Sequence, residues 1–475
     1  MPLPSQIIKA LNDRGRLYEV GGAVRDRLRY ALSRDTGELD PARFWGYAPG
    51  ESDYLVTGLP LDELTGLLGG FGPVELVGKA FGILKFKLQI ANLKHRTVDI
   101  ALPRKERSTG IGHRDFDIEC DPALPVTEDL QRRDFTINAM ALRITNSEDR
   151  LSKPELVDPC GGVQDIRDNL IRLVSPEAFE QDPLRMLRAC QFAARFEYAV
   201  ERDTFNAISR HSALVTTVPP ERVQQELNKL LTKSEQPSIG LWLMQRSGLL
   251  AHVLPELEQG VGMAQPGDFH RYTVFEHCIR AADFVPRDKG LELRLAGLLH
   301  DVAKPRCREL GEGLVHFYGH DKEGEAIARA VLARLKYSKE IINKVARLVR
   351  WHMFAYPETE KGLRRLIAKT GEAGLYDLIE LRRADILAQG QAGADATKLL
   401  DTFEQLATEQ ISSSPPFSLR DLAIGGDELQ REFGLRSGPL IGELLGHLLE
   451  FVLEHPTKNT REDLLDRAAR WLAQR

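Results

Sequence analysis

The fold of the N-terminal part follows from the stretch VGGAVRD at residues 20–26 of this chain of 475 residues. It comes after the apolar run 17–20, which predicts a strand, and leads into a helical pattern at 23–33. Two glycines here let the backbone approach an anion closely, and the free N–H groups of a helix start favour a phosphate. An ordinary strand–turn–helix is the simpler alternative.

Two carboxylates follow, Glu51 and Asp53, directly ahead of the apolar run 54–57. Residues two apart on a strand point to the same side, so both side chains can reach one point. Asp99 alternates with apolar residues in the run 96–102 and is a candidate third carboxylate. Neighbouring carboxylates suit Mg²⁺, and two such ions can activate an attacking hydroxyl and stabilise pyrophosphate. A solvated acidic turn and an exposed strand Asp are the alternatives.

The composition is that of a soluble protein, with 42% apolar and 28% charged residues, and the length predicts three or four modules. The net charge of −5 predicts that any RNA is bound by local basic patches. Five scattered cysteines without a Cys-x-x-Cys pair indicate a reduced, cytoplasmic chain. We expect neither a signal peptide nor a membrane span.

The pattern of apolar residues changes along the chain. Strand signals fill the first ~145 residues, and helical periodicity runs from about residue 177 to the end. We therefore expect an α+β fold in which a small α/β module precedes an all-helical part. The predicted parts are residues 1–148, 149–255, 256–392 and 393–475.

Four further motifs follow in order: RRDFTINA at 132–139, DPCGG at 158–162, DPLRMLRA at 182–189 and PERV at 220–223. Together with the glycines and carboxylates, they resemble the bacterial class II CCA-adding enzymes and poly(A) polymerases along almost the whole chain. The resemblance implies a nucleotidyltransferase head with a small mixed sheet, then a helical neck and body, and a helical tail. Glycine turns at 425–426 and 438 precede helical patterns in this tail and can hold an RNA phosphate, and plain capping turns are the alternative.

The resemblance also implies a role for each matching residue. Glu51 and Asp53 hold Mg²⁺, and Asp99 completes the catalytic set. The nucleotide is bound by Gly21, Gly22 and Arg25 at the triphosphate, by Arg133, Asp134 and Asn138 near the ribose, by Asp182 and Arg185 at the base, and by Arg188 toward phosphate. Because Asp182 and Arg185 are three residues apart, we expect them to share one helix face, unless they form a structural ion pair.

Four positions depart from the family pattern. Glu51 stands where Asp is usual and Gln181 where Glu is usual, while Cys160 and Gln191 replace other residues, Gln191 a frequent Arg. The basic segment 103–122, with glycines at 110 and 112, predicts a mobile loop, and a plain surface loop is the alternative. By the same resemblance, family members that add only the two C residues typically lack such a loop, so its presence favours addition of the terminal A.

A second group of metal-binding residue types lies in the helical part. Its members are His277, His300, Asp301, His320, His352 and Asp385. The spacing resembles the HD phosphohydrolases, which implies a divalent transition metal or Mg²⁺ at His277, His300, Asp301 and Asp385, and a second one at His320 and His352. The implied reaction is hydrolysis of a phosphoester on RNA or a nucleotide, with Lys304 stabilising the developing charge.

These observations predict an enzyme that adds CCA, or its terminal A, to the 3′ end of tRNA from CTP and ATP. A poly(A) polymerase is one alternative. An HD phosphohydrolase whose head only binds RNA is another, and the oligomeric state stays open.

Overall fold

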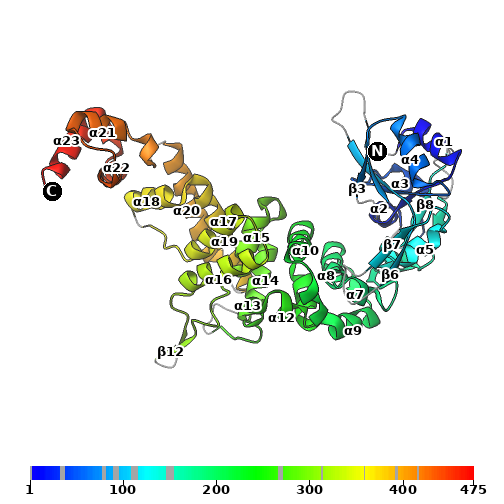
Figure 1. Ribbon diagram of the computed structural model, residues 1–475. Helices are drawn as coiled ribbons and strands as arrows, with labels where there is room; N and C mark the ends of the chain where they lie inside the picture. The colour runs from blue at the N-terminus through cyan, green and yellow to red at the C-terminus, as the bar shows by residue number, and fades with distance from the viewer. Residues whose placement is uncertain are drawn as a thin grey trace. The chain divides into compact units, whose positions relative to one another are not determined.

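The computed structural model describes residues 3–32, 38–77, 82–88, 96–108, 116–145, 154–265, 271–311, 314–357, 359–390, 394–413 and 417–474 (Figure 1). Internal contacts divide the chain into two units, Met1–Pro255 and Glu256–Arg475. The predicted boundary at 255/256 lies at this division, and the boundaries at 148/149 and 392/393 stay predictions.

A mixed seven-stranded sheet forms the centre of the N-terminal part, as predicted. Its strands in spatial order are β3 (Val74–Val77), β4 (Ile83–Leu88), β5 (Arg96–Ala101), β2 (Asp53–Thr57), β1 (Arg16–Val20), β8 (Ala141–Arg143) and β9 (Leu156–Val157). Strands β2 and β5 run parallel, and the other neighbours are antiparallel. The expected α+β fold with a small mixed sheet is confirmed.

The two faces of this sheet have different neighbours. Tyr54 and Val56 point to one face, where they pack with residues of α1 (Ser5–Asn12) and α4 (Leu61–Gly69). Leu55 points to the other face and packs with residues of α5 (Val126–Gln131). Because side chains alternate along a strand, Asp53 lies on the same face as Leu55.

Further helices complete the first unit. They are α2 (Gly22–Ala31), α3 (Pro41–Gly46), η1 (Thr136–Asn138), α6 (Gly162–Arg167), α7 (Ala178–Gln181), α8 (Leu184–Phe196), α9 (Arg202–His211), η2 (Ser212–Thr217), α10 (Pro220–Lys233), α11 (Ser238–Arg246), α12 (Leu249–Val253) and α13 (Pro255–Glu258), which crosses the division. The short strands β10 (Leu170–Ile171) and β11 (Ala199–Val200) pair in parallel.

The segment 103–122 is not simply a loop. Its flanks form an antiparallel hairpin, β6 (Arg104–Ser108) and β7 (Phe116–Cys120). Polar residues fill β6 without apolar alternation, so the usual sequence signal of a strand is missing. The predicted flexible glycines at 110 and 112, and His113 and Arg114, lie outside the described residues.

The second unit is mainly helical. Its helices are α14 (Val274–Phe284), η3 (Arg287–Lys289), α15 (Leu291–Leu299), α16 (His320–Arg334), α17 (Lys339–Trp351), α18 (Glu360–Thr370), α19 (Glu372–Ala388), α20 (Ala394–Ser412), η4 (Leu419–Asp421), α21 (Gly426–Phe433), α22 (Pro439–Glu454), η5 (Pro456–Lys458) and α23 (Arg461–Leu472). A small hairpin, β12 (Glu309–Gly311) and β13 (Leu314–His316), interrupts the predicted helical run, as β11 does earlier. Among the described residues, no helix combines the length and apolar character needed to cross a membrane.

Candidate active site and metal centre

A cleft of about 1190 Å³ lies within the first unit. It brings together residues that are far apart in the sequence and that come from the sheet, from the glycine turn and from two helices of the body. The predicted site residues that line it are Gly21, Gly22, Arg25, Glu51, Asp53, Arg133, Asp134, Asn138, Asp182, Arg185 and Arg188. Of the residues predicted for this site, Asp99 alone does not line the cleft, although it is the strand partner of Asp53, which does.

The strand register places the carboxylates together. Asp53 pairs with Asp99 across the parallel strands β2 and β5, so both lie on the same face of the sheet. Strand β2 begins at Asp53, so the expectation that strand alternation would align Glu51 with Asp53 was wrong. The pKa of Asp53 is raised, first by partial burial of its carboxyl group and then by the charges of Asp99 and Glu51. A divalent cation would relieve this repulsion, so the group fits Mg²⁺.

The glycine turn lies against Arg133. Gly21 has a φ of 70° and is the N-cap of α2, and a Cβ atom added to it would come within 2.9 Å of Arg133 Nη1. The positive φ therefore favours glycine, and a Cβ atom here would displace the flexible end of Arg133. Arg25, one turn into α2, donates to Asn138 Oδ1 at 2.6 Å.

Three arginines lie close together where α2 contacts α8, and two of them, Arg25 and Arg195, line the cleft. The pKa of Arg195 is lowered, first by burial and then by the charges of Arg25 and Arg29. The guanidinium groups of all three lie over the Phe196 ring, 4.2–5.0 Å from its centroid. Such a concentration of positive charge favours an anion with several charges, such as a triphosphate.

Asp134 connects the head to helix α8. Its Oδ2 accepts from Arg188 Nε at 2.8 Å, and its Oδ1 accepts from Asn138 Nδ2 at 3.1 Å. Burial alone would raise the pKa of Asp134, but the Arg188 guanidinium and the Asn138 hydrogen bond hold it below its usual value. The carboxylate is therefore ionised and fixed in place.

The prediction that Asp182 and Arg185 share one helix face is wrong. Asp182 lies in extended backbone after α7, and α8 begins at Leu184, because a residue that precedes proline disfavours the helical conformation. Its Oδ2 instead pairs with Arg222 Nη2 at 2.9 Å. Arg185 Nη2 donates to the backbone carbonyl of Arg132 at 3.1 Å. Both side chains nevertheless line the cleft.

Helix α10 contributes cleft residues to which sequence reasoning gave no role. Arg222, Glu226 and Lys229 all line the cleft. Their spacing of four and then three residues places them on one helix face, and this polar stripe is visible in the sequence. Further lining residues without a predicted nucleotide role are Arg104, Arg132, Gln181, Gln191, Phe192 and Arg195.

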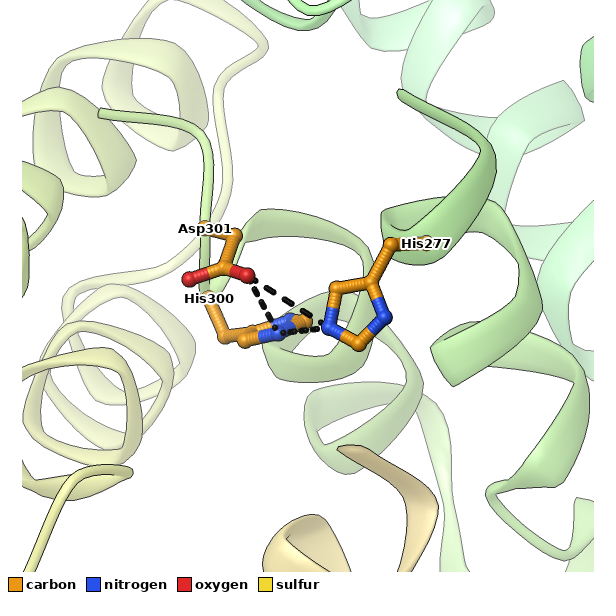
Figure 2. Close-up of side chains that lie close together, drawn as sticks. All are labelled: His277, His300 and Asp301. Atoms are coloured by element: carbon orange, nitrogen blue, oxygen red, sulfur yellow. Dashed lines mark hydrogen bonds and ion pairs between the residues drawn. The ribbon is translucent and has the colours of Figure 1, made fainter. Parts of the chain in front are cut away.

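The second predicted cluster also comes together, within the second unit. His277 lies on α14 and Asp385 on α19, while His320 begins α16 and His352 follows α17. His300 and Asp301 follow the end of α15. Figure 2 shows His277, His300 and Asp301 pointing toward one another, with the two Nε2 atoms 3.0 Å apart.

Asp301 is shared between two groups of ligands. Its Oδ2 lies 3.4 Å from His277 Nε2 and 3.2 Å from His300 Nε2. Its Oδ1 lies 3.4 Å from His320 Nε2 and 3.7 Å from His352 Nε2. One carboxylate can thus bridge two neighbouring cations, a feature that the sequence did not predict.

Two of these histidines can each present a ring nitrogen to a cation. Nδ1 of His320 lies 2.7 Å from the carbonyl oxygen of Phe317, and Nδ1 of His352 lies 2.7 Å from that of Val349. If each Nδ1 carries the proton and donates it to this carbonyl, each Nε2 presents a lone pair. These two Nε2 atoms lie 3.2 Å apart, an arrangement that a bound cation stabilises. Lys304 donates to Asp301 Oδ2 at 2.6 Å beside them.

Comparison with curated proteins gives the family. An A-adding tRNA nucleotidyltransferase of Deinococcus radiodurans is 36% identical over 341 residues, which cover 68% of this chain and 74% of that protein. The chain belongs to the tRNA nucleotidyltransferase family. A CC-adding tRNA nucleotidyltransferase of Thermus thermophilus is also 36% identical to this nucleotidyltransferase, over 68% of the chain and 72% of that protein.

Three family descriptions match successive parts of this nucleotidyltransferase. They are the poly A polymerase head domain at residues 71–172, a probable RNA- and SrmB-binding site of polymerase A at 197–260, and tRNA nucleotidyltransferase domain 2 (putative) at 317–468. The crystal structure of the Bacillus stearothermophilus CCA-adding enzyme in complex with CTP shares the fold. It has a TM-score of 0.70 and 21% identity, with both chains fully covered.

Proposed function

We propose that the cleft of the first unit transfers nucleotides from ATP and CTP to the 3′ end of tRNA. The observation that carries this proposal is the meeting of three groups in one cleft. They are a glycine turn beside crowded arginines, a cluster of carboxylates, and the polar faces of α8 and α10. The first group suits a triphosphate, the second a metal-dependent transfer, and the third a nucleobase.

Each group has its own task in this proposal. Glu51, Asp53 and Asp99 would hold Mg²⁺, which when bound activates the attacking hydroxyl and stabilises the leaving pyrophosphate. Gly21 and Gly22 bring backbone N–H groups close to the triphosphate. Arg25, Arg133 and Arg188 supply positive charge along the cleft, and fixed charges of this kind stabilise charge that develops during the transfer.

The ribose and base would be read by fixed polar groups. Asp134 and Asn138 lie near the expected ribose position, and an ionised Asp134 can accept from a 2′-hydroxyl. Asp182 and Arg185 face the base, and Arg222 holds the Asp182 carboxylate. A carboxylate that accepts and a guanidinium that donates match the polar edge of cytosine or adenine without a template.

The product is proposed as CCA or its terminal A. The two relatives are equally identical to this chain, but one is an A-adding and the other a CC-adding enzyme, so identity alone does not choose between the two products. The segment 103–122 favours the ability to add A. Poly(A) synthesis on the same scaffold is the second candidate, and a head that only binds RNA is the third.

One assay separates these products. Purified protein is incubated with Mg²⁺, labelled CTP or ATP, and tRNA transcripts that end before C74, end after C75, or are complete. Label from CTP on the shortest transcript indicates full CCA addition, and label from ATP alone on the transcript ending in CC indicates A addition. Long A tails indicate a poly(A) polymerase. Absence of label in every reaction would refute nucleotide transfer.

We further propose that the histidine cluster of the second unit is an HD-type phosphohydrolase centre, with residues 256–392 as its domain and 393–475 as the tail. What supports this is the sharing of Asp301 by two ligand groups beside a pocket of about 330 Å³. Divalent ions held there would supply a nucleophile at neutral pH for attack on a phosphoester. Lys304, buried next to Asp301, supplies positive charge at the pocket.

The test uses the full chain with His300→Ala. The variant should lose hydrolysis of nucleoside 2′,3′-cyclic phosphates and terminal phosphomonoesters and keep nucleotide transfer at the wild-type rate. His252→Ala, an exposed position on α12, serves as the control and should keep both activities. Loss of transfer together with hydrolysis would contradict separate sites, and absence of hydrolysis in the wild-type protein would refute this second function.

A further inference from the structure

Among the buried polar atoms of the cleft that lack a hydrogen-bond partner in the described structure are one on α8 and one on α10. They are Nε2 of Gln191 on α8 and Oε2 of Glu226 on α10. Both residues line the cleft, and only 1% of Gln191 and 4% of Glu226 is exposed. Buried polar groups in folded proteins are almost always paired, so a donor and an acceptor left open in a cleft indicate a missing ligand.

The Glu226 carboxylate is fixed by its surroundings. Its Oε1 accepts from Lys229 Nζ at 2.8 Å and lies 3.9 Å from Arg188 Nη1. Arg188 in turn pairs with Asp134 at 2.6 Å. This network links Glu226 to the residues near the proposed ribose position. Oε1 is thereby occupied, and Oε2 is the oxygen that a ligand can use.

A donor and an acceptor together have the hydrogen-bonding pattern complementary to one kind of nucleobase edge. Adenine and cytosine each present a bare ring nitrogen next to an exocyclic amino group, which accept and donate respectively. Guanine and uracil present a ring N–H next to a carbonyl oxygen, so the same two protein groups would meet like groups. A mismatched edge leaves buried polar groups unpaired, which is a strong basis for rejection.

We propose that Gln191 and Glu226 form a second base-reading position, distinct from Asp182 and Arg185. Gln191 Nε2 donates to the ring nitrogen, and Glu226 Oε2 accepts from the amino group of adenine or cytosine. The proposal rests on nucleotide transfer in this cleft. The base that is read belongs either to the incoming nucleotide or to the 3′-terminal residue of the RNA, because adenine or cytosine can stand at both positions.

The test uses Gln191→Leu and Glu226→Gln in the full chain. The measurements are kcat/KM for ATP, CTP, GTP and UTP, and KM for transcripts that end in C, A, G or U. Loss of one hydrogen bond should lower the preference for adenine and cytosine over guanine and uracil by about tenfold. In Glu226→Gln the amide oxygen can face Lys229 and leave the NH₂ group in the cleft, which should favour guanine and uracil.

Two arms identify the source of the base. A loss of selectivity among nucleoside triphosphates assigns the position to the incoming nucleotide, and a loss among transcript ends assigns it to the RNA. Equilibrium binding of ATP and GTP to the protein gives the first comparison without catalysis. Gln225→Leu, at an exposed position on α10, is the matched control and should keep wild-type selectivity.

The melting temperature distinguishes a side chain that binds a base from one that only supports the fold. Because Gln191 Nε2 has no protein partner in the described structure, leucine at this position should not lower the melting temperature. A lower melting temperature with unchanged selectivity in both arms would overturn the proposal, as would a uniform loss of rate for all four nucleotides. If the wild-type protein transfers nucleotides and the variants keep its selectivity, this inference alone fails.

Discussion

Replacing Asp134 with asparagine removes the charge at the junction between the head and α8. The Asp134 carboxylate accepts from Arg188 Nε at 2.8 Å and Nη2 at 2.6 Å, from Asn138 Nδ2 at 3.1 Å and from the Phe135 N–H at 2.8 Å. An asparagine oxygen can still accept from Asn138 and Phe135. Its NH₂ group, however, would face the donors of Arg188, which loses its buried counter-charge.

Breaking a buried ion pair by removing one partner costs about 3–5 kcal/mol. Because 31% of the Arg188 side chain is exposed and can be hydrated, we expect the lower end, about 3 kcal/mol. The measurement is native-state hydrogen exchange in peptides from β1 and α8, which reports on the first unit separately. Protection in Asp134→Asn should fall by about a hundredfold.

Asp203→Asn is the control, because Asp203 is exposed in the first turn of α9 and its loss should change stability by less than about 0.5 kcal/mol. A loss of protection in Asp134→Asn no larger than in this control would show that the ion pair with Arg188 does not hold the junction.

Three further predictions concern single features. Gly21→Ala should lower the free energy of unfolding by about 1–3 kcal/mol, because a φ of 70° is strained for alanine, and thermal unfolding measures this change. The same substitution should displace Arg133 and so raise the KM for ATP, which steady-state kinetics measures. Because the folded-state pKa of Asp134 is lowered, the ionised carboxylate stabilises the fold fully above pH ~3.9, and this contribution is lost as the pH falls through the folded-state pKa. The difference in free energy of unfolding between wild-type and Asp134→Asn proteins, measured along an acid titration, should therefore shrink below pH ~3.9. Mn²⁺ at a hundredfold excess over its Kd should raise the free energy of unfolding of the second unit by about 2.7 kcal/mol, and EDTA or Asp301→Asn should remove this increase. An equal increase in the wild-type protein and in Asp301→Asn would contradict metal binding by Asp301.

The sheet was largely predictable because its central strands carry strong local signals. In β2 and β5, apolar residues on the face toward α1 and α4 alternate with Asp53 and Asp99. The hairpin β6–β7 was missed because β6 is entirely polar, although Phe116, Ile118 and Cys120 alternate with acidic residues in β7. The pairing of β2 with β5 depends on contacts between distant segments, and no local pattern contains that information.

The site residues were predictable as types and less so as partners. Motif matches identified Asp182, but not that Pro183 would keep it outside the helix and that Arg222 would hold its carboxylate. The bridging position of Asp301 likewise depends on how α16 and α17 pack, which brings His320 and His352 to its second oxygen. Such relations follow from tertiary packing and not from spacing along the chain.

The central claim is metal-dependent transfer at the carboxylates of β2 and β5, and Asp53→Ala tests it most directly. Labelled ATP is supplied with Mg²⁺ and a tRNA transcript that ends after C75, and incorporation is compared with that of wild-type protein and of Asp62→Ala, an exposed carboxylate on α4. We predict that the wild-type protein and Asp62→Ala add one labelled A and that Asp53→Ala adds none. Incorporation by Asp53→Ala at the wild-type rate would contradict the assignment of the active site.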